Sequence, residues 1–161
     1  MSRKTSEYLP AILNGVTGIG VLLMSFFVDL RFPIPKEIAK PSGLFIVALG
    51  MFLVIWASLY IREAMWGEVE PRLNVLVQEG PYRFVRHPVY LGMTIALAGA
   101  TVTLRSWLGI IGVFFLFLPT EIYRARLEEG ALSRKFGDEW KRYATRTGFI
   151  LPFVGKRKVE C

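Results

Sequence analysis

The chain has 161 residues, 53% of them hydrophobic, and a mean hydropathy of +0.41. A soluble domain of this length could not bury so many apolar residues in unbroken blocks, so the composition excludes an ordinary soluble fold. The net charge of +7 is compatible with nucleic-acid binding, but Lys and Arg flank the apolar blocks as they do in membrane proteins. We therefore expect one integral membrane domain over residues 1–161, with membrane lipids as partners and no nucleic acid.

Two apolar blocks come first, at about Leu9–Val28 and Ser42–Ile61. Each has the roughly 20 residues that a helix needs to cross a hydrocarbon core about 30 Å thick. A signal peptide is the alternative for the first block, but its length and the lack of a small-residue cleavage site favour a retained helix. Residues 1–61 are thus predicted to form two N-terminal spans, separated by a proline-containing connector at 29–41.

A third apolar block, from Val89 to Pro119, follows the polar segment Arg62–Pro88 and contains one charge, Arg105. A single helix over this block would be about 46 Å long, more than the hydrocarbon core. We therefore predict a hairpin that turns at Thr103–Ser106. Its two helices, of about 15 residues each, suit a site near one membrane face.

The fourth helix is expected to continue past Pro119, out of the membrane, towards Phe136. Gly137 would end it, and a further short helix is predicted at Asp138–Thr145. Of the 20 Lys and Arg residues, 16 lie in the amino end, the Arg62–Pro88 segment and the tail, so we predict that both termini are cytoplasmic. The expected fold is all-α: a polytopic membrane bundle of about four transmembrane helices, the last two forming a hairpin, with cytoplasmic C-terminal helices.

Small and polar residues inside the predicted spans indicate how the helices pack. Glycines let helices approach closely, within a chain or between chains. They occur at Gly15, Gly18 and Gly20 in the first span and at Gly109 and Gly112 in the fourth. Asn14, a polar residue inside the first span, is a candidate for a hydrogen bond to another helix. An oligomer is compatible with these features but is not predicted.

The block 80–92 holds the single histidine of the chain, His87, between Arg86 and Pro88 and just before a membrane helix. Pro88 pre-organises the first helical turn, whose free N–H groups, with Arg86, would make an anion site. Gly92 would let a ligand or a neighbouring helix approach the backbone. The alternative is a membrane-interface anchor, because Arg and Tyr commonly flank a membrane helix.

The block 124–132 places Arg124 and Glu128 four residues apart, on one helix face. This pair would suit an amino-acid-like head group, with its carboxylate on Arg124 and its ammonium on Glu128. The alternative is a solvated helix with ordinary ion pairs. In the following block, Trp140 and Tyr143 would on one interpretation anchor a helix on the membrane surface.

Taken together and in order, these blocks resemble the isoprenylcysteine carboxyl methyltransferase family of integral membrane enzymes. The match covers a methyltransferase-like core at about 80–153 and rests on Arg86-His87-Pro88-x-Tyr90-x-Gly92, Arg124-x3-Glu128-Glu129-x2-Leu132-x3-Phe136-Gly137-x-Glu139-Trp140-x2-Tyr143, Arg146 and Leu151-Pro152-Phe153. Membrane sterol reductases share a similar Arg-His-Pro element, but the continuation after the paired glutamates makes the match specific. Trp140 stands where the family usually has tyrosine.

The resemblance implies methyl transfer from S-adenosylmethionine to a lipophilic acceptor that enters from the bilayer, most plausibly the carboxylate of an isoprenylcysteine-like substrate. The positions that match the family's cofactor-binding residues are Tyr82, His87, Pro88, Tyr90, Leu91, Gly92, Glu129 and Tyr143. Those that match its catalytic residues are Arg124, Glu128 and Arg146. Either Glu128 or Glu129 would hold the ammonium group of the cofactor.

Two other functions remain as alternatives. One is an NADPH-dependent membrane reductase of the sterol-reductase type, and the other is a non-catalytic membrane assembly factor. No metal site is expected, because one histidine and one terminal cysteine, Cys161, cannot form a His/Cys cluster.

Overall fold

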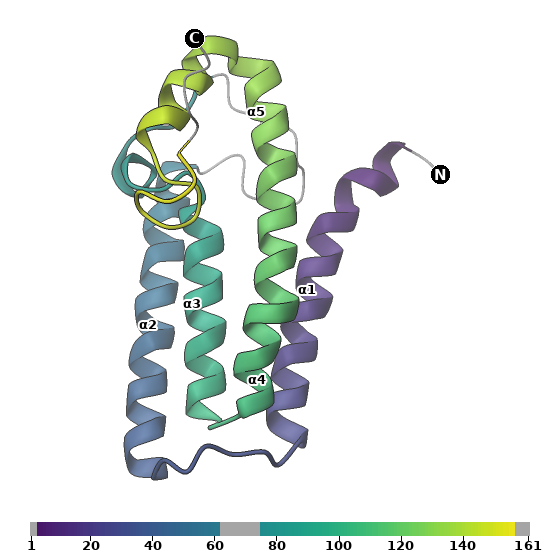
Figure 1. Cartoon of the computed structure of the whole chain (residues 1–161), viewed down its shortest axis with the longest axis vertical. Helices are drawn as coiled ribbons and strands as arrows, with labels where there is room; N and C mark the ends of the chain where they lie inside the picture. Colours follow the sequence, from purple (N-terminus) through teal and green to yellow (C-terminus); the bar gives the residue numbers. More distant parts are fainter. Residues whose placement is uncertain (1–2, 62–74, 157–161) are drawn as a thin grey trace.

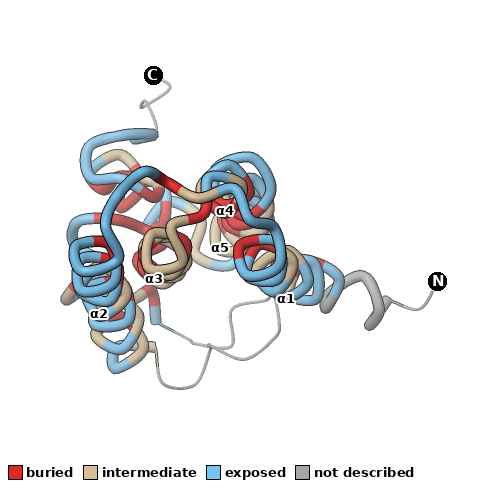
Figure 2. Tube along the Cα trace, turned by 90° about the horizontal axis from the view of Figure 1, so that it is seen from below, coloured by how far each residue is buried: buried red, intermediate tan, exposed pale blue. Residues whose placement is uncertain are grey.

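The computed structural model describes residues 3–61 and 75–156, and residues 62–74, the first half of the predicted polar segment, lie outside it. The described residues are mainly helical (Figure 1). The elements are α1 (Arg3–Phe27), α2 (Lys36–Tyr60), the short 3-10 helix η1 (Gly80–Arg83), α3 (Pro88–Thr103), α4 (Trp107–Gly112), the π-helical turn η2 (Val113–Phe117) and α5 (Leu118–Arg146). Seen along the bundle, the long helices stand in a curved row: α2, α3, α4–α5, α1 (Figure 2).

Three helical stretches in the described part of the chain are long and apolar enough to cross a membrane: Leu9–Phe27, Lys36–Tyr60 and Trp107–Arg146. The fourth, α3, has 16 residues. It measures about 24 Å, somewhat less than the hydrocarbon core. The all-α prediction is confirmed, and of the four predicted spans three have full length.

The predicted hairpin and the helix beyond it are confirmed. α3 ends at Thr103, and α4 begins at Trp107 after a tight turn in which Arg105 has a positive φ of 56°. The helical path then continues past Pro119, the second residue after η2. The wider π turn relieves the clash that a proline makes with the carbonyl four residues earlier. At Gly137, with φ of 52°, the chain leaves the helical conformation and the last piece of α5 turns back over the bundle (Figure 1).

Backbone contact joins α2 to α3. A Cβ atom added to Gly50 would lie 2.4 Å from the backbone nitrogen of Ala96, and one added to Gly99 would lie 2.6 Å from that of Val47. Gly43 and Gly92 show the same close approach in the two helices. Only glycine permits such contact, so the two helices pack as one rigid pair.

The predicted packing glycines are confirmed in part. A Cβ atom at Gly109 would lie 2.1 Å from Ser25 Oγ of α1, and one at Gly112 would lie 2.9 Å from Val21. Gly18 packs on Phe117, whereas Gly15 and Gly20 would meet nothing within 4 Å. Of the glycines in the α2–α3 contact, Gly92 was singled out from the sequence as a site of close approach, whereas Gly43, Gly50 and Gly99 were not.

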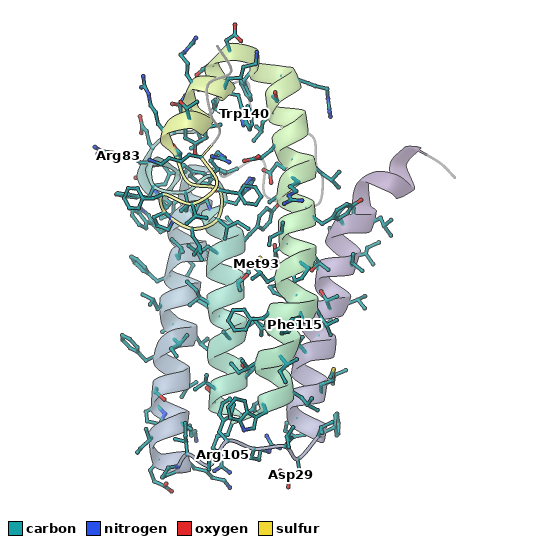
Figure 3. The ribbon with its side chains drawn as sticks, in the orientation of Figure 1. Asp29, Arg83, Met93, Arg105, Phe115 and Trp140 are labelled. Carbon is teal, nitrogen blue, oxygen red and sulfur yellow. The ribbon has the colours of Figure 1, made fainter. Side chains whose placement is uncertain are left out.

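The two ends of the bundle differ. At one end, the α3–α4 turn is fastened to the α1–α2 connector, where the amide of Phe32 donates to the Arg105 carbonyl at 2.7 Å. The opposite end carries η1, the turned-back tail and the beginning of α1, as Figure 3 shows by placing Arg83 and Trp140 far from Asp29 and Arg105. The polar segments therefore share one end, as the charge count requires, and the cytoplasmic location of that end stays a prediction.

Candidate active site

Arg86 joins the segment before α3 to the tail. Its guanidinium forms an ion pair with Glu129 of α5 and donates hydrogen bonds to three backbone carbonyls. These carbonyls belong to Ala144, Thr147 and Gly155. In the same junction, the amide of His87 donates to the carbonyl of Phe149 at 3.2 Å. Arg86 is only 5% exposed. The prediction that it contributes to an anion site is therefore wrong, because Glu129 and the tail already use its donors.

His87 lies between the two glutamates of the acidic pair. Its Nε2 is 3.6 Å from Glu129 Oε1, and its Nδ1 is 3.7 Å from Glu128 Oε2. Tyr90, one turn into α3, stacks on His87 with ring centroids 5.4 Å apart and donates its hydroxyl to Glu128 Oε2 at 2.9 Å. Four of the predicted site residues, His87, Tyr90, Glu128 and Glu129, thus form one cluster between α5 and the start of α3.

The two carboxylates of this cluster have different surroundings. Glu129 lies about 33 Å along the helix from Trp107, beyond the length needed to cross the core. Burial alone would raise the pKa of its carboxyl, but the polar contact with His87 and the charge of Arg86 outweigh burial and lower that pKa. The Glu128 side chain is 34% exposed and accepts a hydrogen bond from Tyr90. Glu128 is therefore the carboxylate better placed to meet a cationic ligand.

Tyr82 of η1 and Tyr143 of α5 pack beside the cluster. Tyr143 donates its hydroxyl to the backbone oxygen of Tyr82 at 2.7 Å. Burial, reinforced by the charge of Glu128, raises the pKa of Tyr82 well above its ordinary value, so its phenol stays protonated. Trp140 (Figure 3), on the last piece of α5, is fully buried and packs with Tyr143 in a small core that includes Leu76. The alternative that Trp140 and Tyr143 anchor a helix on the membrane surface is wrong.

The two predicted catalytic arginines lie in different places. The guanidinium of Arg124 lies over the Tyr90 ring, 5.6 Å from its centroid, so it belongs to the cluster. Arg146 is exposed and lines a pocket of about 520 Å³ together with Tyr143. The other residues lining this pocket are Gln78, Arg83, Glu139, Arg142 and Thr147. Tyr143 and Thr147, whose carbonyl accepts a hydrogen bond from Arg86, connect this basic pocket with the cluster.

The remaining predicted cofactor residues open α3. Pro88 is buried at its first position, and the amide of Leu91 donates to the His87 carbonyl at 3.1 Å. Gly92 faces α2, where an added Cβ atom would lie 2.8 Å from the Gly50 carbonyl. The close approach at Gly92 is therefore made by a helix, and its part in cofactor binding stays a prediction.

One acidic residue near the cluster was not singled out from the sequence. Glu121 of α5 is 0% exposed, and neither carboxylate oxygen has a hydrogen-bond partner among the described residues. It lies one turn before Arg124 and two turns before Glu128. The signal in the sequence was its position at the end of the apolar block, where it looked like the first residue to leave the membrane.

Comparison with known proteins agrees with this architecture. A family model described as phospholipid methyltransferase matches residues 39–139. Methanethiol S-methyltransferase 1 of Bradyrhizobium diazoefficiens is 36% identical over 72 residues, which cover 45% of this chain and 24% of that protein. Protein-S-isoprenylcysteine O-methyltransferase of Mus musculus is 35% identical over 125 residues, which cover 70% of this chain and 44% of the mouse protein.

A solved structure shares the fold. The eukaryotic intramembrane Ras methyltransferase ICMT (isoprenylcysteine carboxyl methyltransferase) superposes with a TM-score of 0.60 at 24% identity, covering 98% of this chain and 56% of that one. The chain therefore spans about half the length, or less, of the relatives it matches. Because the family model covers more than half of the chain, this protein belongs to the phospholipid methyltransferase family of multi-pass integral membrane methyltransferases.

Proposed function

We propose that this protein transfers a methyl group from S-adenosylmethionine to a lipophilic acceptor, with its active site at the cluster of His87, Tyr90, Glu128 and Glu129. One observation carries the proposal. Arg86 neutralises Glu129, whereas Glu128 contacts a phenol and the edge of an imidazole and forms no ion pair with Arg or Lys in the described part of the chain, so the cluster keeps a negative charge beside a buried aromatic surface. Such a site suits a cation that carries a flat ring.

The residues present fit the cofactor that the family uses. When bound, S-adenosylmethionine supplies an electrophilic methyl group on a sulfonium centre. The buried Nε2 of His87 makes no hydrogen bond among the described residues, although it lies 3.6 Å from Glu129. It is thus available to a ligand group. The cofactor would be held by the cluster and by the start of α3, through Tyr82, His87, Pro88, Tyr90, Leu91, Gly92, Glu129 and Tyr143.

The proposed catalytic residues would act by position and charge. Glu128 would hold the cofactor's positive charge, and Tyr90 orients it through the 2.9 Å hydrogen bond. Arg124, which makes a ring contact rather than an ion pair with Glu128 in the described part of the chain, would meet a negatively charged or polar group of a ligand. Arg146, in the basic pocket, would attract a ligand carboxylate. Holding the reactants in line in a site with little water then supplies most of the rate enhancement.

The acceptor is expected to enter from the bilayer, because the faces of α1, α2 and η2 are covered with exposed large apolar side chains that only lipid can surround. The relatives name two kinds of acceptor: the isoprenylcysteine carboxylate and methanethiol. The isoprenylcysteine-like carboxylate predicted from the sequence is the reference acceptor for a first assay. By the positive-inside rule, the site is expected at the cytoplasmic face.

The test is calorimetric titration of the protein in mild detergent with S-adenosylhomocysteine, with NADPH as a parallel ligand. We expect micromolar binding of S-adenosylhomocysteine, weakened at least tenfold in Glu128→Gln. Arg124→Ala should also weaken this binding. Its matched control is Arg126→Ala, at an exposed arginine two residues along the same helix, and that variant should bind like the wild type. Binding of NADPH instead would support the reductase, and failure of both ligands to bind folded protein would leave the assembly factor.

A further inference from the structure

Glu121 is a buried carboxylate that the proposed function has not used. It is among the largest fully buried side chains of the protein, and both of its oxygens lack a hydrogen-bond partner within the described residues. It lies one turn before Arg124 and two turns before Glu128 on the same helix. The side chain therefore lies on the face of α5 that carries the cluster, on the membrane side of it.

A second buried polar side chain lies at the same level. Asn14 of α1 is 3% exposed, and neither its amide nitrogen nor its amide oxygen has a partner among the described residues. The hydroxyl groups of Thr17 and Thr120, 3.3 Å apart, join α1 to α5 next to this level, since Thr17 lies one turn from Asn14 and Thr120 directly precedes Glu121. Two polar groups without partners at one depth indicate a polar ligand group there, because burying them alone is unfavourable.

We propose that Glu121 receives the proton of the methyl acceptor, and that the acceptor is therefore a lipophilic thiol or amine rather than a carboxylate. This inference rests on the proposed function and specifies the acceptor of that same site. A carboxylate acceptor is already ionised at neutral pH and needs no base, whereas a thiol or an ammonium group must lose a proton before it can attack.

The charges of the site support this choice. Arg86 and Arg124 balance the charges of Glu128 and Glu129, so the net positive charge of a bound sulfonium cofactor favours the ionised form of the buried Glu121. A carboxylate acceptor beside an ionised Glu121 would add an uncompensated anion in a low-dielectric region, but a neutral thiol or amine would not.

The position of Glu121 suits the direction of entry. It precedes Glu128 by seven residues, about 10 Å along the helix towards the bilayer interior. In the step itself, the lone pair of the acceptor sulfur or nitrogen forms a bond to the methyl carbon. The bond from that carbon to the sulfonium breaks, and its electron pair stays on the donor sulfur as a neutral thioether. The acceptor's proton passes to the Glu121 carboxylate and from there to water at the membrane surface.

The experiment compares three acceptors on one farnesyl tail, a thiol, an amine and an S-farnesylcysteine carboxylate, with protein in nanodiscs. We expect the wild type to methylate the thiol or the amine at least tenfold faster than the carboxylate. Glu121→Gln, which keeps the side-chain shape, should lower that rate about 100-fold. Glu121→Asp should keep part of it, and Glu37→Gln, an exposed glutamate at the start of α2, should keep all of it.

Two measurements without turnover separate this inference from the proposed function. S-adenosylhomocysteine should bind Glu121→Gln within about twofold of the wild type, since Glu121 lies outside the cofactor cluster; if the wild type does not bind it, the proposed function itself fails. Farnesylamine, titrated calorimetrically without cofactor, should bind Glu121→Gln at least tenfold more weakly than the wild type. Equal methylation of the carboxylate by the wild type would overturn the inference. Full activity in Glu121→Gln would also overturn it. So would a loss of activity in Glu121→Gln that comes with lowered stability, if Asn14→Leu shows the same two losses.

Discussion

The two sides of α3 are held by different kinds of contact. Towards α2, backbone meets backbone across Gly50, Gly92 and Gly99. Towards α5, the contact is made by side chains, in which Tyr90 bonds to Glu128 and His87 lies between the acidic pair. The first side leaves no room for adjustment, because a single methyl group would collide with main-chain atoms. The second depends on charge and can change with a ligand. A rigid support on one side thus lets the other side be used for chemistry.

The largest expected effect comes from breaking the polar side at Arg86. Arg86→Ala leaves Glu129 buried without its cation and three tail carbonyls without their donor, so we expect the free energy of unfolding to fall by about 3–5 kcal/mol. Unfolding in detergent micelles, followed by circular dichroism, measures it. Arg83→Ala, an exposed arginine three residues earlier, should change stability by less than about 0.5 kcal/mol. Equal effects of the two substitutions would mean that the buried ion pair does not hold the tail.

The rigid side should be broken by a single methyl group. In Gly50→Ala the new Cβ atom would lie 2.4 Å from a backbone nitrogen of α3. The helices must move apart, and we expect a loss of about 1–3 kcal/mol in the same unfolding assay. Gly15→Ala is the matched control, because nothing lies within 4 Å of its added Cβ atom. If Gly50→Ala is as stable as Gly15→Ala, α2 and α3 are not in backbone contact.

A smaller effect should separate ligand binding from stability. Tyr90→Phe keeps the ring that stacks on His87 and removes only the hydrogen bond to Glu128. We expect binding of S-adenosylhomocysteine to weaken about tenfold, which is about 1.4 kcal/mol, with little change in unfolding. Tyr123→Phe, at a tyrosine that is 51% exposed, should change neither quantity. A stability loss in Tyr90→Phe as large as the binding loss would make Tyr90 a structural residue.

Much of the fold could be predicted because the membrane imposes lengths. The hydrophobic blocks fixed the approximate spans, and the length of the third block required a turn near Arg105. Gly137 could be recognised as a helix stop because glycine readily adopts the positive φ at which helices commonly end. These features are local, and local sequence reports them.

Contacts between helices were harder to predict. Nothing in the sequence of α2 says that Gly43 and Gly50 face α3, because that depends on how far each helix is rotated about its axis. Arg86 was taken for an anion-binding residue because its partner Glu129 lies far along the chain. Glu121 looked like a helix residue leaving the membrane, and only the packing of α1 and α3 around α5 shows that it is buried.

The last expected effect concerns pH and the acidic pair. Since Arg86 and His87 together hold the pKa of the Glu129 carboxyl below its ordinary value despite burial, the folded protein keeps that group ionised in acid better than the unfolded chain does. Its contribution to stability is therefore complete above the pKa of an unfolded glutamate, about 4.3, and disappears as the pH falls through the lower folded value. Unfolding titrations between neutral pH and pH 3 should show this acid-side decline, and Glu129→Gln should make it shallower. Glu37→Gln, which alters an exposed carboxylate at the other end of the bundle, should leave the decline unchanged, so a similar slope in all three proteins would remove Glu129 from the polar contact that holds α5 to α3.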